Sequence, residues 1–171
     1  LLKASIRDDD PVAFFEGELL YALKGDVPDD DDHVVPLGVA DIKREGKHVS
    51  ILTHGKMVHV ATQAAEKLAK DGVEAEVVDL RTLRPLDHET ILASVEKTGK
   101  ALVVHEANRF GGFGAEVAAT IAEKAFEHLD GPVTRLAGPE VPGVPFHHTL
   151  EDWFMVNPAR IVAAARELAA Y

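Results

Sequence analysis

Val49-Ser50-Ile51-Leu52-Thr53-His54-Gly55 is the stretch that decides the fold of this chain. Its short apolar run, closed by His54-Gly55, predicts a buried strand. A helix is expected directly after it, over residues 57–70, because apolar residues recur on one face until Asp71-Gly72 stops the pattern. A strand followed at once by an amphipathic helix indicates an α/β unit.

The same alternation continues toward the C-terminus. Strands are expected over residues 75–80, 101–104 and 133–136, and helices over residues 88–98, 112–129 and 158–170. Short strands that alternate with longer helices predict a mostly parallel sheet with helices on both faces. We therefore predict a three-layer α/β domain over residues 37–171.

Toward the N-terminus the alternation stops. Residues 1–7 are expected to be the end of an amphipathic helix, and Val12-Ala13-Phe14-Phe15 a short buried strand. Residues 24–36 are rich in aspartate and proline, which predicts a linker. Because the chain starts without Met and partway into a helix pattern, we expect residues 1–24 to be the tail of a preceding domain and residues 25–36 to connect it.

The composition narrows the classes of function. The chain has 171 residues and a formal net charge of −11, from 18 basic and 29 acidic residues. This balance argues against a nucleic-acid partner and fits a basic protein partner, although a solvated acidic surface is the commoner explanation. No apolar run is long enough for a membrane span. The lack of cysteine excludes disulfides and thiolate nucleophiles and permits the cytoplasmic location that we expect.

Polar residues follow several of the expected strands, where open α/β sheets bind their ligands. Arg81 and Arg84 lie in the densest polar loop and could grip a carboxylate or phosphate. Alternatively, Arg81 pairs with Asp79 or Asp87 and holds the loop. The sequence leaves both interpretations open.

Two further motifs are candidates for the edge of a site or an interface. His105 and Glu106 lie side by side on a strand and so point to opposite faces, which excludes a joint acid–base pair by adjacency. We expect His105 to have a structural, hydrogen-bonded role. Gly112 belongs to a glycine cluster before a helix, which suits a tight turn or the close approach of a partner. The cluster fails the dinucleotide fingerprint because Val117 replaces its third glycine.

The sequence has no motif typical of a metal site or of a catalytic nucleophile. The histidines lack metal-ligand spacing, and the imidazoles of His147-His148 are expected to diverge. There is no Gly-x-Ser-x-Gly elbow and no cysteine nucleophile. We therefore predict no metal site and no catalytic residue from the motifs.

In their order along the chain, these motifs resemble the beta subunit of thiamine-diphosphate-dependent 2-oxoacid dehydrogenases. The motifs that carry the resemblance are residues 37–40 (LGVA), 78–87 (VDLRTLRPLD), 97–99 (KTG), 105–106 (HE), 111–116 (GGFGAE) and 130–135 (DGPVTR). The match runs over nearly the whole chain. It implies a transketolase C-terminal-type domain over residues 37–171, with a five-stranded, mostly parallel sheet, and a C-terminal remnant of the pyrimidine-binding domain over residues 1–24.

The resemblance also implies a function and its partners. Residues 16–21 (EGELLY) are similar to the pyruvate and acetoin enzymes, although Gly17 departs from their usual asparagine. We expect a pyruvate dehydrogenase beta subunit, with acetoin or branched-chain 2-oxoacid enzymes, or a non-catalytic interaction module, as alternatives. The partners would be an alpha subunit, a second beta subunit and the subunit-binding domain of a dihydrolipoyl acyltransferase.

The family's catalytic residues lie in the upstream domain, so the resemblance implies no catalytic residue here and no activity of this portion alone. Thiamine diphosphate and magnesium would be held in the intact heterotetramer, mostly by the alpha subunit. Docking on the acyltransferase would use Asp130 and the carboxylate of Tyr171, with help from Glu127. Alternatively, Asp130 merely begins the turn Asp130-Gly131-Pro132. The loop over residues 141–148 is about one residue longer than usual for the family, which leaves its role at an interface open.

Overall fold

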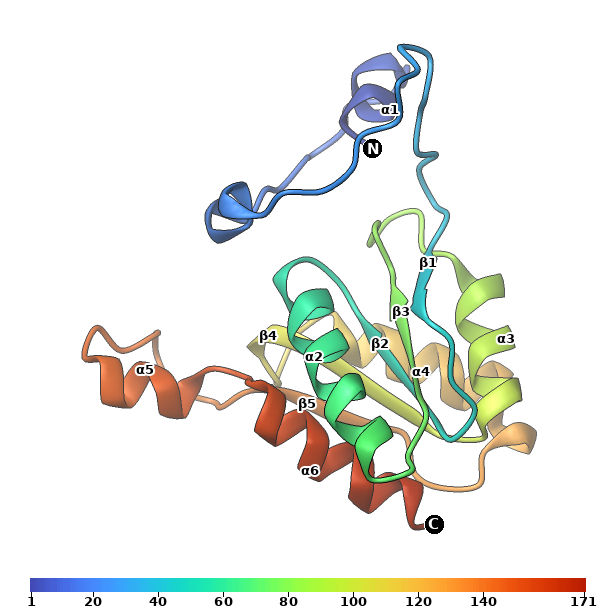
Figure 1. Cartoon of the computed structure of the whole chain (residues 1–171), viewed down its shortest axis with the longest axis vertical. Coiled ribbons are helices and arrows are strands. Elements are labelled where there is room, and N and C mark those ends of the chain that lie inside the picture. Colours follow the sequence, from blue (N-terminus) through green and yellow to red (C-terminus); the bar gives the residue numbers. More distant parts are fainter.

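Five strands form one sheet in the order β1-β3-β2-β4-β5, in a computed structural model that describes residues 1–171 (Figure 1). The strands are β1 (Asp41–Arg44), β2 (Val49–Thr53), β3 (Ala75–Asp79), β4 (Ala101–Asn108) and β5 (Thr134–Gly138). β1 pairs antiparallel with β3, and the other pairs are parallel. The predicted five-stranded, mostly parallel sheet is confirmed.

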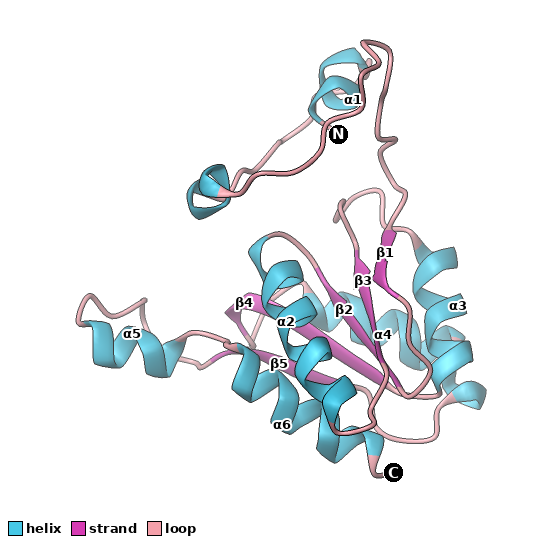
Figure 2. Ribbon diagram, in the orientation of Figure 1, coloured by secondary structure: helices cyan, strands magenta, loops and turns pink.

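Helices cover both faces of the sheet, as predicted (Figure 2). α2 (Lys56–Lys70) and α6 (Pro158–Ala169) pack together on one face, over a core that includes Ile51 and Leu102. α3 (His88–Thr98) and α4 (Gly114–Lys124) cover the other face, over Leu52 and Val103. Because alternate residues of a strand point to opposite faces, neighbouring residues of β2 and β4 supply both cores.

Local signals fix the ends of the helices. Asp87 caps α3, since its carboxylate accepts the Thr90 N–H at 3.0 Å, and Gly99 ends the helix in the left-handed conformation. Asn157 caps α6 in the same way through the N–H of Arg160. Four of the five strands agree with the predicted positions; β1 was missed because Asp-Ile-Lys-Arg carries little apolar pattern.

Two expectations about individual elements were wrong, and one helix was not predicted. The long helix expected to reach residue 129 ends at Lys124 and is followed by the short 3₁₀ helix η2 (Phe126–His128), because Ala125 leaves the helical conformation. Residues 12–15 form no strand, since no other strand lies beside them. The short helix α5 (His148–Phe154) was not predicted.

Residues 1–36 lie apart from the sheet domain (Figure 1). They contain α1 (Leu2–Arg7) and the 3₁₀ helix η1 (Glu18–Ala22), neither of which has a buried residue. Large apolar side chains are exposed here, among them Phe15 at 91% and Val27 at 85%. None of the chain's helices has both the length and the apolar character that a membrane crossing needs.

Candidate docking surface and sheet-edge loops

The loop between β3 and α3 holds the segment before β1 in place. Asp87 accepts the backbone N–H of Ala40 at 2.8 Å in addition to capping α3. The hydroxyl of Thr82 accepts the N–H of Gly38 at 3.1 Å and donates to the carbonyl of Pro85 at 2.8 Å. Partial burial raises the pKa of the Asp87 carboxyl, but the hydrogen bonds that it accepts from the N–H groups of Thr90 and Ala40 and from the Thr90 hydroxyl outweigh burial and lower the pKa. The motif at residues 78–87 therefore has a structural role.

Arg81 is engaged within the chain, which decides one of the alternatives left open. Its guanidinium pairs with Asp41 at 2.7 Å, and its backbone N–H donates to the Asp79 carboxylate at 3.0 Å. The partner of the guanidinium is thus neither of the acids considered from the sequence, because the antiparallel strand β1 brings Asp41 next to β3. Arg84 is exposed beside the same loop, and the structure gives it no ion pair.

His105 is buried but lacks the hydrogen bond that we expected. Its ring is 2% exposed, and neither ring nitrogen has a hydrogen-bond partner. The ring packs directly against Gly112 and Gly114, where an added Cβ would clash with it. Burial lowers the pKa of His105, and the nearby His54 and Arg135 lower it further, against the opposing effect of the Ala107 backbone. Gly112 is therefore required for packing.

Glu106 points away from His105, as predicted, and pairs with Lys56 at 3.6 Å. His54, at the end of β2, meets the ring of Phe113 edge-on with the ring centres 6.2 Å apart. Burial lowers the pKa of His54, although Asp79 and Glu106 oppose this. These contacts hold the glycine loop onto the carboxyl ends of the strands, so His54, which was not predicted as a site residue, belongs to the same cluster.

Asp130 lies at the opposite, amino-terminal edge of the sheet, before β5. Its backbone N–H donates to the carbonyl of Gly99 at 2.8 Å, and its carboxylate covers the α-carbon of Gly99. This packing is possible only because Gly99 lacks a side chain. Asp130 therefore packs against Gly99 at the start of its turn, which gives its carboxylate a defined orientation.

The other two residues expected for docking lie beside Asp130. A Cβ added at Gly131 would lie 3.2 Å from Cβ and Cγ of Tyr171, so the two residues are in contact, and Tyr171 is 69% exposed. A shallow hollow is lined by Ala122, Phe126, Glu127, Leu129, Asp130, Gly131, Pro132 and Val133. Asp130 and Glu127 thus line one hollow, and Tyr171 lies beside it against Gly131. We call these three residues, with Phe126, the acidic hollow.

The acidic hollow combines negative charge with exposed apolar surface. Two of its lining residues are acidic and none is Lys or Arg. The ring of Phe126 is 76% exposed, and the Glu127 side chain is 86% exposed. The nearest histidine, His128, lies 3.7 Å from both Glu96 and Glu127. Such a surface can bind a basic partner with an apolar contact point.

The described residues do not fit a binding site for thiamine diphosphate or magnesium. No group of three or more His, Asp or Glu side chains is placed to hold a metal ion. Arg81, the candidate for a phosphate grip, already pairs with Asp41. His147 and His148 stack with their ring centres 4.5 Å apart, whereas we expected them to diverge. We therefore assign no chemical step on the cofactor to this chain.

Comparison with known proteins decides the family. Residues 38–161 match the family described as the transketolase C-terminal domain. The chain belongs to this family. A solved split-gene transketolase, described as an inactive beta4 tetramer, has 28% sequence identity and a TM-score of 0.72 over 82% of this chain and 45% of its own. Asp130 and Glu127 lie within the family match, and Tyr171 lies beyond it.

Relatives extend the match over the whole chain. The 2-oxoisovalerate dehydrogenase subunit beta of Bacillus subtilis is 53% identical, over 100% of this chain and 52% of the relative. An acetoin:2,6-dichlorophenolindophenol oxidoreductase subunit beta of Cupriavidus necator is 48% identical, over 98% of this chain and 49% of the relative. The pyruvate dehydrogenase E1 component subunit beta of Bacillus subtilis is 46% identical, over 98% of this chain and 51% of the relative.

These relatives confirm the predicted resemblance to 2-oxoacid dehydrogenase beta subunits. The transketolase C-terminal domain of this chain spans all five strands of the sheet, and the chain covers about half the length of the relatives that it matches. The comparisons do not single out pyruvate among the substrates in the relatives' names.

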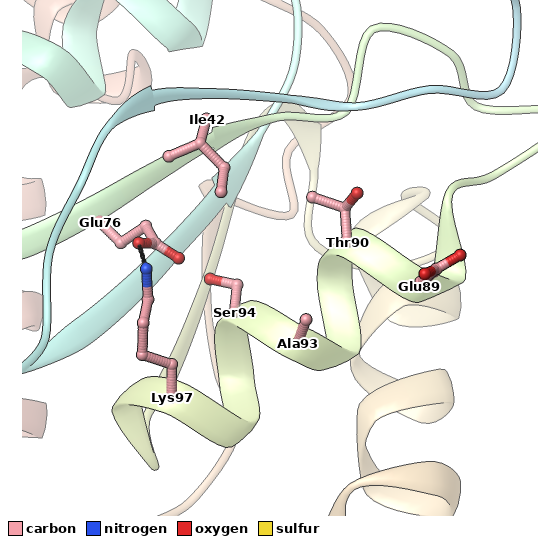
Figure 3. Close-up of a pocket in the computed structure, with 7 residues that line it drawn as sticks. All are labelled: Ile42, Glu76, Glu89, Thr90, Ala93, Ser94 and Lys97. Atoms are coloured by element: carbon pink, nitrogen blue, oxygen red, sulfur yellow. Dashed lines mark hydrogen bonds and ion pairs between the residues drawn. The ribbon is translucent and has the colours of Figure 1, made fainter.

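One buried charge was missed by the sequence reasoning. Glu76 is the second residue of β3 and is fully buried, where it pairs with Lys97 of α3 (Figure 3). The signal was present in the sequence, because a glutamate that interrupts an apolar strand needs a partner.

Proposed function

We propose that this chain is the C-terminal portion of the beta subunit of a thiamine-diphosphate-dependent 2-oxoacid dehydrogenase, in which it supports subunit assembly and docking on the acyltransferase. The full enzyme would decarboxylate its 2-oxoacid oxidatively and transfer the acyl group to lipoyl. The observation that supports the docking role is the acidic hollow, which Asp130 and Glu127 line and beside which Tyr171 contacts Gly131.

The proposed docking partner is the subunit-binding domain of a dihydrolipoyl acyltransferase. Its basic character would complement the acids of the hollow, which no Lys or Arg of the lining neutralises. Exposed charges of this kind speed association and fix the register of an interface more than they add affinity. The exposed ring of Phe126 would supply the apolar contact that charge alone lacks.

The other partners follow from the exposed N-terminal segment and from the relatives. We propose that residues 1–24 complete an upstream pyrimidine-binding domain, that residues 25–36 link it to the C-terminal domain, and that an alpha and a second beta subunit complete the enzyme. The apolar side chains exposed in this segment, such as Phe15, suit burial against such a domain. The beta4 tetramer of the split-gene transketolase supports contacts between beta subunits. The proposal includes the cytoplasmic location expected from the sequence.

The substrate has two candidates. Pyruvate is favoured by residues 16–21, which are similar to the pyruvate and acetoin enzymes. A branched-chain 2-oxoacid is favoured by the identity of 53% with the 2-oxoisovalerate relative, against 46% with the pyruvate relative. We retain pyruvate as the first proposal and the branched-chain substrate as the second.

A single assay tests which substrate the enzyme prefers and whether activity requires the upstream half. The chain, and the chain with an upstream half restored from a relative, are each mixed with an alpha subunit, thiamine diphosphate, magnesium and an artificial electron acceptor. Decarboxylation of pyruvate in preference to 2-oxoisovalerate, by the restored chain alone, is the expected result. The reverse preference would select the second candidate, and activity of the unrestored chain would overturn the assembly role.

A further inference from the structure

The side chain of Lys100 reaches from the residue before β4 to the C-terminal end of α6. Its Nζ donates to the backbone carbonyl of Ala169 at 3.4 Å, although the two residues lie 69 positions apart in the sequence. Ala169 is the last residue of α6. The last carbonyls of an α-helix have no partner within the helix, and a cation beside them also interacts favourably with the helix dipole. Lys100 therefore caps α6 from outside the helix.

The backbone of Lys100 is held firmly, so its side chain starts from a defined point. Its carbonyl accepts the N–H of Ser50 at 2.8 Å and the hydroxyl of Thr98 at 3.1 Å. Lys100 also follows Gly99 directly, and Gly99 is the residue against which Asp130 packs. Lys100 thus connects the anchor of Asp130 to the end of α6.

The chain end that Lys100 holds lies beside Asp130. The N–H of Tyr171 donates to the carbonyl of Leu168 at 3.3 Å, and the side chain of Leu168 is buried. A Cβ added at Gly131, the neighbour of Asp130, would lie 3.2 Å from Tyr171 and 3.4 Å from Leu168. The position of the C-terminal carboxylate relative to Asp130 therefore depends on how the last turn of α6 is held.

The basic residue within that turn is engaged elsewhere. Arg166 is the basic residue in the last turn of α6, and it pairs with Asp71 at the end of α2. The contact of Lys100, by contrast, is with a carbonyl rather than a carboxylate. Lys100 can therefore order the chain end without forming an ion pair with an acid of the acidic hollow.

We propose that Lys100 is a positioning residue for docking, which holds the last turn of α6 so that the C-terminal carboxylate and Asp130 keep a fixed separation. This inference rests on the proposed function, because it concerns the proposed docking surface. A basic partner that contacts both acids binds more tightly when they are already ordered, since less conformational entropy is lost.

The charge of Lys100 gives the proposal a distinctive sign. Lys100 is itself basic, so by charge alone it would repel a basic partner, and its removal would strengthen binding. If Lys100 positions the chain end, its removal should instead weaken binding. The two effects therefore predict opposite results for the same substitution.

Calorimetric titration with the acyltransferase subunit-binding domain distinguishes these results in the full 171-residue chain. We expect Lys100→Met to bind about three- to fivefold more weakly, and Lys100→Arg, which keeps a donor, to bind within about twofold of the parent. Lys67→Met removes the same charge at an exposed position of α2 and is the matched control, with no loss expected. Unchanged or tighter binding of Lys100→Met would overturn the proposal.

A chain without residues 169–171 tests the path of the effect. It lacks the carbonyl that Lys100 contacts and the native position of the carboxylate, so Lys100→Met should change its affinity by less than about twofold. A full loss of about three- to fivefold in this shortened chain would show that Lys100 acts on the partner directly, which would contradict a positioning role.

NMR relaxation of the 171-residue chain gives a readout that needs no partner. In Lys100→Met the order parameters of the Ala170 and Tyr171 amides should fall below about 0.6, the flexible range, while Lys100→Arg keeps the higher values of the parent. Equal order parameters in Lys100→Met and the parent would overturn the positioning role, even if docking itself were confirmed. If order is lost as expected but the parent chain does not bind the domain, the proposed docking function fails and Lys100 only anchors the chain end.

Discussion

Gly99 and Asp130 hold each other in place across the amino-terminal edge of the sheet. The N–H of Asp130 donates to the carbonyl of Gly99 at 2.8 Å, and the Asp130 carboxylate covers the position where a Gly99 side chain would begin. Gly99 also ends α3 in the left-handed conformation, with φ of 68°. One glycine therefore controls both the end of a helix and the orientation of the acid proposed for docking.

Gly99→Ala should weaken docking, and Gly72→Ala should not. Both glycines have positive φ, so both substitutions should lower the free energy of unfolding by about 1–2 kcal/mol. Only the Cβ at Gly99 meets Asp130, whereas that at Gly72 meets open space. Chemical denaturation measures the loss of stability that both variants should share. Calorimetric titration with the acyltransferase domain measures the loss of docking affinity that only Gly99→Ala should show. If the two variants docked with equal affinity, the orientation of Asp130 would not contribute to docking.

Gly112→Ala should destabilise the domain. The added Cβ would clash with the His105 ring and with the carbonyl of Asn108, and such overpacking costs about 1–3 kcal/mol. Gly143→Ala is the matched control, since nothing lies within 4 Å of its added Cβ. Thermal unfolding followed by circular dichroism would compare them. A Gly112→Ala variant as stable as Gly143→Ala would show that the glycine loop moves freely.

The stability of the domain should fall as the pH drops from about 7 to about 5. Burial lowers the pKa of His105 from its ordinary 6.5, with His54 and Arg135 acting in the same direction. The unfolded chain therefore takes up a proton first as the pH falls through about 6.5, which favours unfolding. His54, whose pKa is also lowered by burial against the effect of Asp79 and Glu106, contributes with the same sign.

His105→Leu isolates the share of this pH dependence that belongs to His105. The ring nitrogens have no partners to lose, so we expect stability at pH 8 to change by no more than about 1 kcal/mol. Between pH 7 and pH 5 the variant should lose less stability than the parent chain. His59→Leu, at an exposed position of α2, should keep the parent slope. A variant with an unchanged slope would assign the effect to other groups.

The sequence predicted the layers of the fold because each has a strong periodic signal. β2 and β4 are apolar runs, and α2 carries its apolar residues on one face, so their positions follow from burial alone. Asp87 and Gly99 mark the two ends of α3 by ordinary capping chemistry. The antiparallel strand β1 gives no such signal, because it is a short edge strand that is half polar.

The site was predicted less completely because its contacts join distant parts of the chain. The sequence offered Asp79 and Asp87 as partners of Arg81, yet Asp41 is the partner, since sheet pairing brings β1 to β3. Glu76 is recognisable as a charge in an apolar strand, but its pairing with Lys97 depends on how α3 crosses the sheet. The family resemblance, by contrast, grouped Asp130, Glu127 and Tyr171 for docking, which stays a prediction; the two acids line one hollow, and Tyr171 contacts Gly131 beside it.

The most direct test of the docking role is the affinity of Asp130→Arg for the acyltransferase subunit-binding domain, measured by calorimetric titration at low and high salt. Asp152→Arg, on the exposed face of α5, carries the same change of net charge and is the control. We expect Asp130→Arg to bind about five- to tenfold more weakly at low salt, with a flatter salt dependence, while Asp152→Arg stays close to the parent. Unchanged binding of Asp130→Arg at low salt, or an equal loss in both variants, would contradict docking at the acidic hollow.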